Sequence, residues 1–290
     1  MTKLEYTFKN DTLFKKLFVD YPDLLKHLAA TLLGIRYESI EQFVITNPDM
    51  PPEAIGDKFC RLDINMTVDG WRVDLEIQVE NEHDFPERTL FYWAREYSTA
   101  LCAGKGFIEA PQVVIVSIVA FKLFDCVEFH SEYRALEVTR HTPLTNRMSL
   151  HYFELPKLPK AMSADDVLLI WLKLFDADTE EELKQIEALE VPLMQEAIEA
   201  YRSITATEEF RTLERMRSDA RRNEASALEN ARREERSKWE SVIADKDAKW
   251  ESVVADKDAK WESVVADKDA ENVRLRSQLA ELQAKLKGTL

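Results

Sequence analysis

The sequence predicts an α/β fold, in which a mixed sheet is flanked by helices and followed by a long C-terminal helical coiled-coil tail. Two neighbouring segments alternate polar and apolar residues and are joined by Asp69-Gly70, a dipeptide typical of hairpin turns. A third segment, 112–121, is almost continuously apolar, as in a strand buried on both faces. Helical patterns lie between these segments, and this order of elements is typical of an α/β core.

The first helical pattern covers residues 10–33. Asn10 or Asp11 can cap its start, and apolar residues recur at helical spacing along it. Pro22 predicts a break into two pieces, and Gly34 predicts the end.

The remaining elements follow in chain order. We expect strands at 41–47, 59–68, 71–79 and 112–121, a helix at 84–104 capped by Asp84, a weaker strand at 149–155, and helices from 163 to the end. These elements predict an α/β domain at 1–160, a helical extension at 161–205 and a helical tail at 206–290.

The tail contains three consecutive copies of an 11-residue segment, at 238–270. Trp239, Val242 and Ile243 of the first copy return at equivalent places in the other two and form an apolar stripe on a helix. A lone helix cannot bury such a stripe, so we expect a homo-oligomer formed through the tail. The alternative is a solvated single helix that acts as a spacer.

Composition limits the class of protein. The chain has 290 residues and lacks an apolar run of roughly 18 residues or a signal segment, so we expect no membrane partner. Three cysteines without paired spacing predict reduced thiols and a cytoplasmic location. Residues 1–200 hold 20 Lys and Arg against 35 Asp and Glu, which counts against strong DNA binding unless metal ions or a multimer assist it.

The predicted hairpin carries the chemistry. Strand alternation places Asp74, Glu76, Gln78 and Glu80 on one face, and a turn at 69–70 puts Asp63 opposite Glu76. Converging carboxylates are ligands that Mg²⁺ prefers. The alternative is the solvent-exposed polar face of an antiparallel sheet, and the pattern alone does not exclude it.

The chain resembles the Rpn family of recombination-promoting nucleases, which are also described as PD-(D/E)XK nuclease family transposases. The matching segments are NDTLFKKLF at 10–18, RLDINMTVDGWRVDLEIQVENEHDFPERTLFYWAREYS at 61–98, and the apolar strand from 112. The resemblance covers about residues 8 to 130 and implies a restriction-endonuclease-like fold with metal-dependent DNA cleavage, using Mg²⁺, for which Mn²⁺ can substitute.

Specific roles follow from the resemblance. Asp63 takes the place of the first acid of the motif and Glu76 that of the second, and both would bind the metal. Gln78 stands where the superfamily usually has lysine and would hold the attacking water. Asp11 matches an acid that many relatives place near the metal.

A glutamine cannot supply the positive charge of the usual lysine. Lys15 and Arg88 are candidates for a replacement cation, and the alternative for each is a solvent-facing salt bridge. The five histidines show no metal-ligand spacing, so we expect surface or core positions for them.

Three functions remain open from the sequence. The first is a metal-dependent DNA endonuclease that promotes recombination or transposition. The second is a catalytically weak or inactive protein of the same fold that acts as an oligomeric assembly module. The third keeps the enzyme but assigns it to defence against phage.

Overall fold

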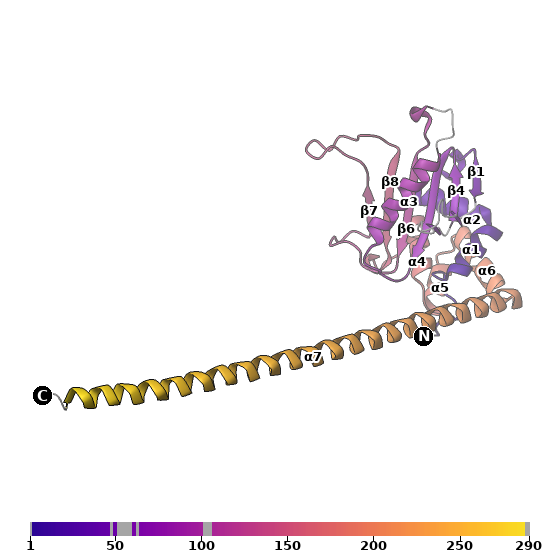
Figure 1. Cartoon of the computed structure of the whole chain (residues 1–290). Coiled ribbons are helices and arrows are strands. Elements are labelled where there is room, and N and C mark those ends of the chain that lie inside the picture. The colour runs from indigo at the N-terminus through magenta and orange to yellow at the C-terminus, as the bar shows by residue number, and fades with distance from the viewer. Residues whose placement is uncertain (1, 47–48, 51–59, 62–63, 101–105, 288–290) are drawn as a thin grey trace. The chain divides into compact units, whose positions relative to one another are not determined.

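The computed structural model describes residues 2–46, 49–50, 60–61, 64–100 and 106–287. The chain divides into two compact units, Met1–Arg215 and Met216–Leu290. The first unit is built on a six-stranded sheet in the order β1-β4-β5-β6-β8-β7 (Figure 1). Its strands are β1 (Phe43–Thr46), β4 (Ile64–Val68), β5 (Trp71–Gln78), β6 (Val113–Val119), β7 (His130–Tyr133) and β8 (Met148–Glu154). A separate two-stranded sheet pairs β2 (Asp49–Met50) with β3 (Cys60–Arg61).

The main sheet is mixed, as predicted. Strands β1, β4 and β5 pair antiparallel, β5, β6 and β8 pair parallel, and β7 lies antiparallel at the edge beside β8. The parallel strands β5 and β6 are joined through a helix, which is the connection that parallel pairing requires. The α-helices are α1 (Asp11–Asp20), α2 (Pro22–Leu33), α3 (Phe85–Ala100), α4 (Val167–Asp176), α5 (Glu180–Glu187), α6 (Pro192–Ala206) and α7 (Glu208–Lys287), with short 3₁₀ turns η1 (Tyr37–Ser39), η2 (Phe107–Glu109) and η3 (Leu155–Lys157).

The first two helices begin and end where the sequence predicts. The side chain of Asn10 accepts a hydrogen bond from the backbone N–H of Leu13 and so caps α1. Pro22 opens α2 at a position where its missing N–H costs no hydrogen bond. Gly34 ends α2 in the left-handed conformation, with φ 66°.

The hairpin between β4 and β5 has the predicted register. Asp69 and Gly70 both have positive φ, 47° and 82°, as a two-residue turn of this kind requires. The described pairs, among them Ile64 with Leu75 and Asn65 with Asp74, have residue numbers that sum to 139. Asp69 also accepts hydrogen bonds from the backbone N–H groups of Glu41 and Gln42, which ties the turn to the start of β1.

The sheet has a different core on each face. On one face, Val73, Leu75 and Ile77 of β5 pack with side chains of α1, α2 and α4–α6. On the other face, Phe85 and Tyr92 of α3 pack with β6 and β8 (Figure 1). Helices α4–α6 therefore complete the core of the first unit.

Strand β7 was not predicted from the sequence. It has four residues, HSEY, three of which are exposed, so it lacks an apolar alternation. It forms because β8 offers an unpaired edge, where a polar strand is tolerated. The described residues of the strand predicted at 59–68 are divided between β3 and β4, which belong to different sheets, and β2 was not predicted either. The other predicted strands and helices are present within a few residues of their expected bounds in the part of the chain that the structure describes.

Helix α7 runs for 80 residues. Phe210, in its first turn, is fully buried in the core of the first unit. In the second unit the large apolar side chains of the repeats are exposed, and the three tryptophans at 239, 250 and 261 are 60%, 67% and 68% exposed. Among the described residues, no helix combines the length and apolar character that crossing a membrane requires.

Candidate active site

The acidic face of β5 is buried. Asp74 and Glu76 are 1% and 5% exposed, although they alternate with the apolar residues of the opposite face. Helix α3 covers this side of the sheet, so the alternative of a solvent-exposed polar face is wrong at these two positions. Charges are buried in proteins only where something compensates them.

Arg88 is the cation beside Glu76. It lies in the first turn of α3, and its Nη2 donates to Glu76 Oε1 at 3.3 Å and to Gln78 Oε1 at 2.9 Å. Its Nη1 donates to Glu82 at 2.5 Å. Burial lowers the pKa of Arg88, but the negative charge of Glu76 and other acids outweighs burial and raises this pKa overall. Arg88 therefore holds a fixed positive charge close to the glutamate.

Gln78 is oriented from both ends of its amide. Its Oε1 accepts from Arg88, and its Nε2 donates to the backbone oxygen of Glu80 at 2.9 Å. A carboxamide has two N–H donors and two acceptor lone pairs, so one of each remains to contact a water molecule.

The other predicted site residues are Asp63, Asp11 and Lys15. Asp63 lies outside the described residues, and its neighbour Ile64 pairs with Leu75, the residue before Glu76. Lys15 lies 3.9 Å from Asp11 in an ion pair within α1. Because α1 packs on the face opposite α3, the structure puts Arg88, rather than Lys15, in hydrogen-bond contact with Glu76.

A second polar group lies one step back along β5. Asp74 faces a cavity of about 230 Å³ that it shares with Asn65, Arg72 and Glu96. Arg72 Nη1 donates to Glu96 Oε2 at 3.0 Å. Burial, followed by the charges of Glu96 and Glu76, raises the pKa of Asp74 well above its usual value. The sequence shows the acidic face of the strand but not this enclosure, because the residues of α3 that close it are about twenty positions away.

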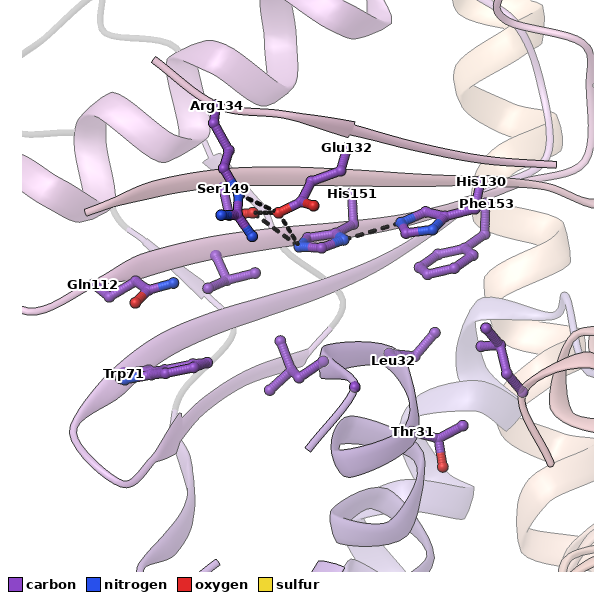
Figure 2. A pocket seen from close by; sticks show the side chains of 14 residues that line it. Thr31, Leu32, Trp71, Gln112, His130, Glu132, Arg134, Ser149, His151 and Phe153 are labelled. Carbon is purple, nitrogen blue, oxygen red and sulfur yellow. Dashed lines mark hydrogen bonds and ion pairs between the residues drawn. The ribbon is translucent and has the colours of Figure 1, made fainter. Parts of the chain in front are cut away.

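Two histidines form a cluster on the opposite face of the sheet. His130 of β7 and His151 of β8 approach to 3.1 Å, and Ser149 Oγ lies 2.9 Å from His151 Nε2 (Figure 2). Ser149 also donates to Glu132, which pairs with Arg134 at 2.5 Å. The cluster lines a cavity of about 300 Å³. Burial lowers the pKa of both histidines, that of His151 to about 4, so both are neutral near pH 7.

The histidines therefore meet although their sequence spacing gives no sign of it. In the described part of the chain, no group of three or more His, Cys, Asp or Glu side chains is arranged to hold a metal ion. The oxygen donors at the Glu76 site, a buried carboxylate and an amide oxygen, nevertheless fit a hard divalent cation, which usually takes one or two carboxylates and keeps several waters.

A mixed sheet whose hairpin leads into a buried Glu-x-Gln strand, with a helix crossing that face, defines a nuclease fold of the restriction-endonuclease type. A family model described as PD-(D/E)XK nuclease family transposase matches residues 8–231, which is more than half of the chain. The chain belongs to this family, and its Rpn-like resemblance is thereby confirmed. Comparisons with curated proteins and with solved structures gave no match.

Family membership gives the function at a coarse level. The chain is a nuclease-family protein with a role related to transposition, for which DNA is the implied partner. PD-(D/E)XK nucleases typically use divalent metal ions.

Proposed function

We propose that the chain is a metal-dependent DNA endonuclease that hydrolyses phosphodiester bonds and promotes recombination or transposition. The observation that carries the proposal is the contact of Arg88 with both Glu76 and Gln78 on a buried strand. It supplies a fixed cation beside the motif glutamate, which the neutral Gln78, at the position where the superfamily usually has lysine, does not supply.

Each residue has a distinct proposed role. Glu76, together with Asp63, would hold Mg²⁺, with Mn²⁺ as a substitute. A bound ion lowers the pKa of its water and neutralises charge that develops on the phosphate. Gln78 would position the attacking water through its remaining N–H and lone pair. Arg88 would contact the scissile phosphate, since guanidinium binds phosphate oxygens with two donors.

Asp11 and Lys15 have supporting roles in the proposal. Their ion pair at 3.9 Å sits in the first turn of α1. Asp11 would assist the metal site, and Lys15 would orient Asp11. These roles are weaker than those of Glu76 and Arg88, because α1 packs on the other face of the sheet.

The test is plasmid nicking with a series of divalent metals. We expect nicking with Mg²⁺ and Mn²⁺ by the wild type, none by Asp63→Ala or Glu76→Gln, and a strong reduction by Arg88→Ala. Arg134→Ala is a matched control, because it removes an arginine that pairs with a glutamate on the other face of the sheet. Equal nicking by Asp63→Ala and the wild type would refute the assignment.

We also propose that the tail joins copies of the chain. The exposed stripe of Trp239, Trp250 and Trp261 recurs every 11 residues and includes valines or isoleucine at 44–54% exposure. Burying such a stripe between copies would stabilise a homo-oligomer through the hydrophobic effect. Two active sites brought together in this way would serve a double-strand cut.

Oligomeric state can be measured by light scattering after gel filtration. We expect the full chain to be oligomeric and a variant with the three tryptophans changed to glutamate to be monomeric. A truncation should end after Arg215, because Phe210 is part of the core of the first unit. A wild type that is monomeric at micromolar concentration would leave the tail as a spacer.

The alternative proposal is a catalytically weak member of the family that acts in assembly or in defence against phage. The net charge of −15 and the glutamine at position 78 favour it. Thermal unfolding shows whether the protein binds Mg²⁺, since a ligand that binds only the native state raises the midpoint of unfolding. A midpoint that rises with Mg²⁺ in the wild type but not in Glu76→Ala, without nicking, would support this alternative.

A further inference from the structure

We infer that the cavity between the hairpin and α3 is a second cation site, in which Asp74 and Glu96 bind a hard divalent cation such as Mg²⁺ or Mn²⁺. The inference does not depend on the proposed nuclease activity, because it concerns residues outside the motif. The cavity holds about 230 Å³ and is lined by Thr46, Asn65, Met66, Thr67, Arg72, Asp74 and Glu96.

The first observation is the state of Asp74. Asp74 is 1% exposed, and no donor among the described residues contacts its Oδ2. A buried carboxylate normally has a hydrogen-bond or charge partner, because transfer of an unpaired charge from water is very unfavourable. Asp74 therefore needs a partner that the described residues do not provide.

The second observation is the balance of charge around Asp74. Glu96 and Glu76 are the acids whose charges act on it, and Arg72 is the cation. Arg72 is already paired with Glu96 at 3.0 Å, and Arg88 is bound to Glu76. Both arginines are thus engaged by other carboxylates, and an additional positive charge in the cavity would compensate Asp74.

The third observation is the chemistry of the lining. Asp74 and Glu96 supply carboxylate oxygens, and the cross-strand neighbour of Asp74 is Asn65, whose amide oxygen is a further donor. Two threonine hydroxyls also line the cavity, and the lining contains no cysteine thiol or imidazole; its sulfur is the thioether of Met66. Oxygen donors of this kind select hard cations over zinc or copper.

The size of the cavity fits the same ion. Water occupies about 30 Å³ per molecule in the liquid, so the cavity has room for a cation with several of its waters. Magnesium in proteins usually keeps such waters and takes only one or two carboxylates. A site with two carboxylates therefore suffices, and a larger cluster of acids is not needed.

The test counts Mn²⁺ ions by calorimetric titration and electron paramagnetic resonance on the full chain. The key variant is Glu76→Gln, which disables the motif site and leaves the cavity intact. We expect this variant to bind one Mn²⁺ and the double variant Glu76→Gln/Asp74→Asn to bind none. Asp176→Asn, an acid that lines a different cavity, is the matched control and should bind as the wild type does.

The same titration separates this inference from the nuclease proposal. Loss of nicking in Glu76→Gln with one Mn²⁺ still bound supports both. The cavity site is overturned if the Glu76→Gln variant binds no Mn²⁺. It is also overturned if this variant binds one Mn²⁺ with the same affinity whether or not Asp74→Asn is added. Either result leaves the nuclease proposal standing.

A second variant keeps the inference testable if Asp74→Asn does not fold. Glu96→Gln, placed on the Glu76→Gln background, should weaken Mn²⁺ binding by at least about tenfold. An unchanged affinity would overturn the assignment of Glu96. If Asp74 were instead a neutral carboxylic acid, Asp74→Asn would fold with wild-type stability and leave Mn²⁺ binding unchanged, which is the overturning result already named.

Discussion

The contacting histidines His130 and His151 make the stability of the first unit depend on pH. Burial lowers the pKa of His151 from 6.5 to about 4, although the charge of Glu132 opposes the shift. The folded state therefore binds this proton less readily than the unfolded state does. Stability is unaffected above pH 6.5, falls as the pH decreases from 6.5 towards 4, and levels off below that range.

The size of the effect follows from the shift. Each pKa unit corresponds to about 1.4 kcal/mol, so a fully expressed shift of this kind reduces the free energy of unfolding by roughly 3 kcal/mol, and by about 2 kcal/mol at pH 5. The side chain of His151 is 12% exposed, so water screens the effect only weakly. His130, whose pKa burial also lowers, adds to the loss in the same direction.

The assay is urea unfolding at several pH values between 7.5 and 5, with the wild type and His151→Gln compared at each. Glutamine keeps a polar side chain near Ser149 but does not titrate, so the difference in unfolding free energy between the two proteins should shrink or reverse as the pH falls. His27→Gln, on α2, is the control and should follow the wild type. A His151→Gln variant with the same pH dependence as the wild type would refute the reasoning.

Three further predictions concern single residues. Arg88→Ala should reduce the rate of Mg²⁺-dependent nicking by roughly a hundredfold or more, because it removes a preorganised hydrogen-bond donor. Arg88→Lys should retain part of the nicking activity. Equal nicking rates in the wild type and both variants would contradict the role of Arg88. Phe210→Ala should lower the free energy of unfolding by about 3–5 kcal/mol in urea, since the ring is fully buried, whereas Leu213→Ala, 44% exposed on the same helix, should cost far less. Gly70→Ala should cost about 1–2 kcal/mol through backbone strain at φ 82° without any clash, so a stability equal to that of the wild type would show that the turn adjusts freely.

The sequence predicted the parts of the fold that local chemistry determines. The ends of α1 and α2 follow from the capping side chain of Asn10 and the left-handed Gly34. The register of the hairpin follows from the two-residue turn at Asp69-Gly70, because the length of the turn fixes which residues pair, and a slip by one residue would move the apolar face to the other side. The family resemblance at residues 10–18 and 61–98 is likewise carried by the sequence alone.

The sequence could not determine what covers the polar face of β5. Alternation assigns Asp74 and Glu76 to one side, but whether that side meets water or a second layer depends on where α3 packs. Its packing buries both acids and brings the Nη2 atom of Arg88 within 3.3 Å of Glu76 Oε1. The sequence does not distinguish Lys15 from Arg88, because each lies near the start of a predicted helix and within one helical turn of an acidic residue.

Pairing between distant strands determined the contact between the two histidines. His130 and His151 meet only because the short polar strand β7 adds to the edge of β8, and neither residue has a local pattern that predicts the contact. Local sequence thus determined the turns, helix ends and strand register, since these depend on neighbouring residues. Tertiary packing decided burial, charge pairing and the lowered pKa values, since these depend on which elements exclude water from a given side chain.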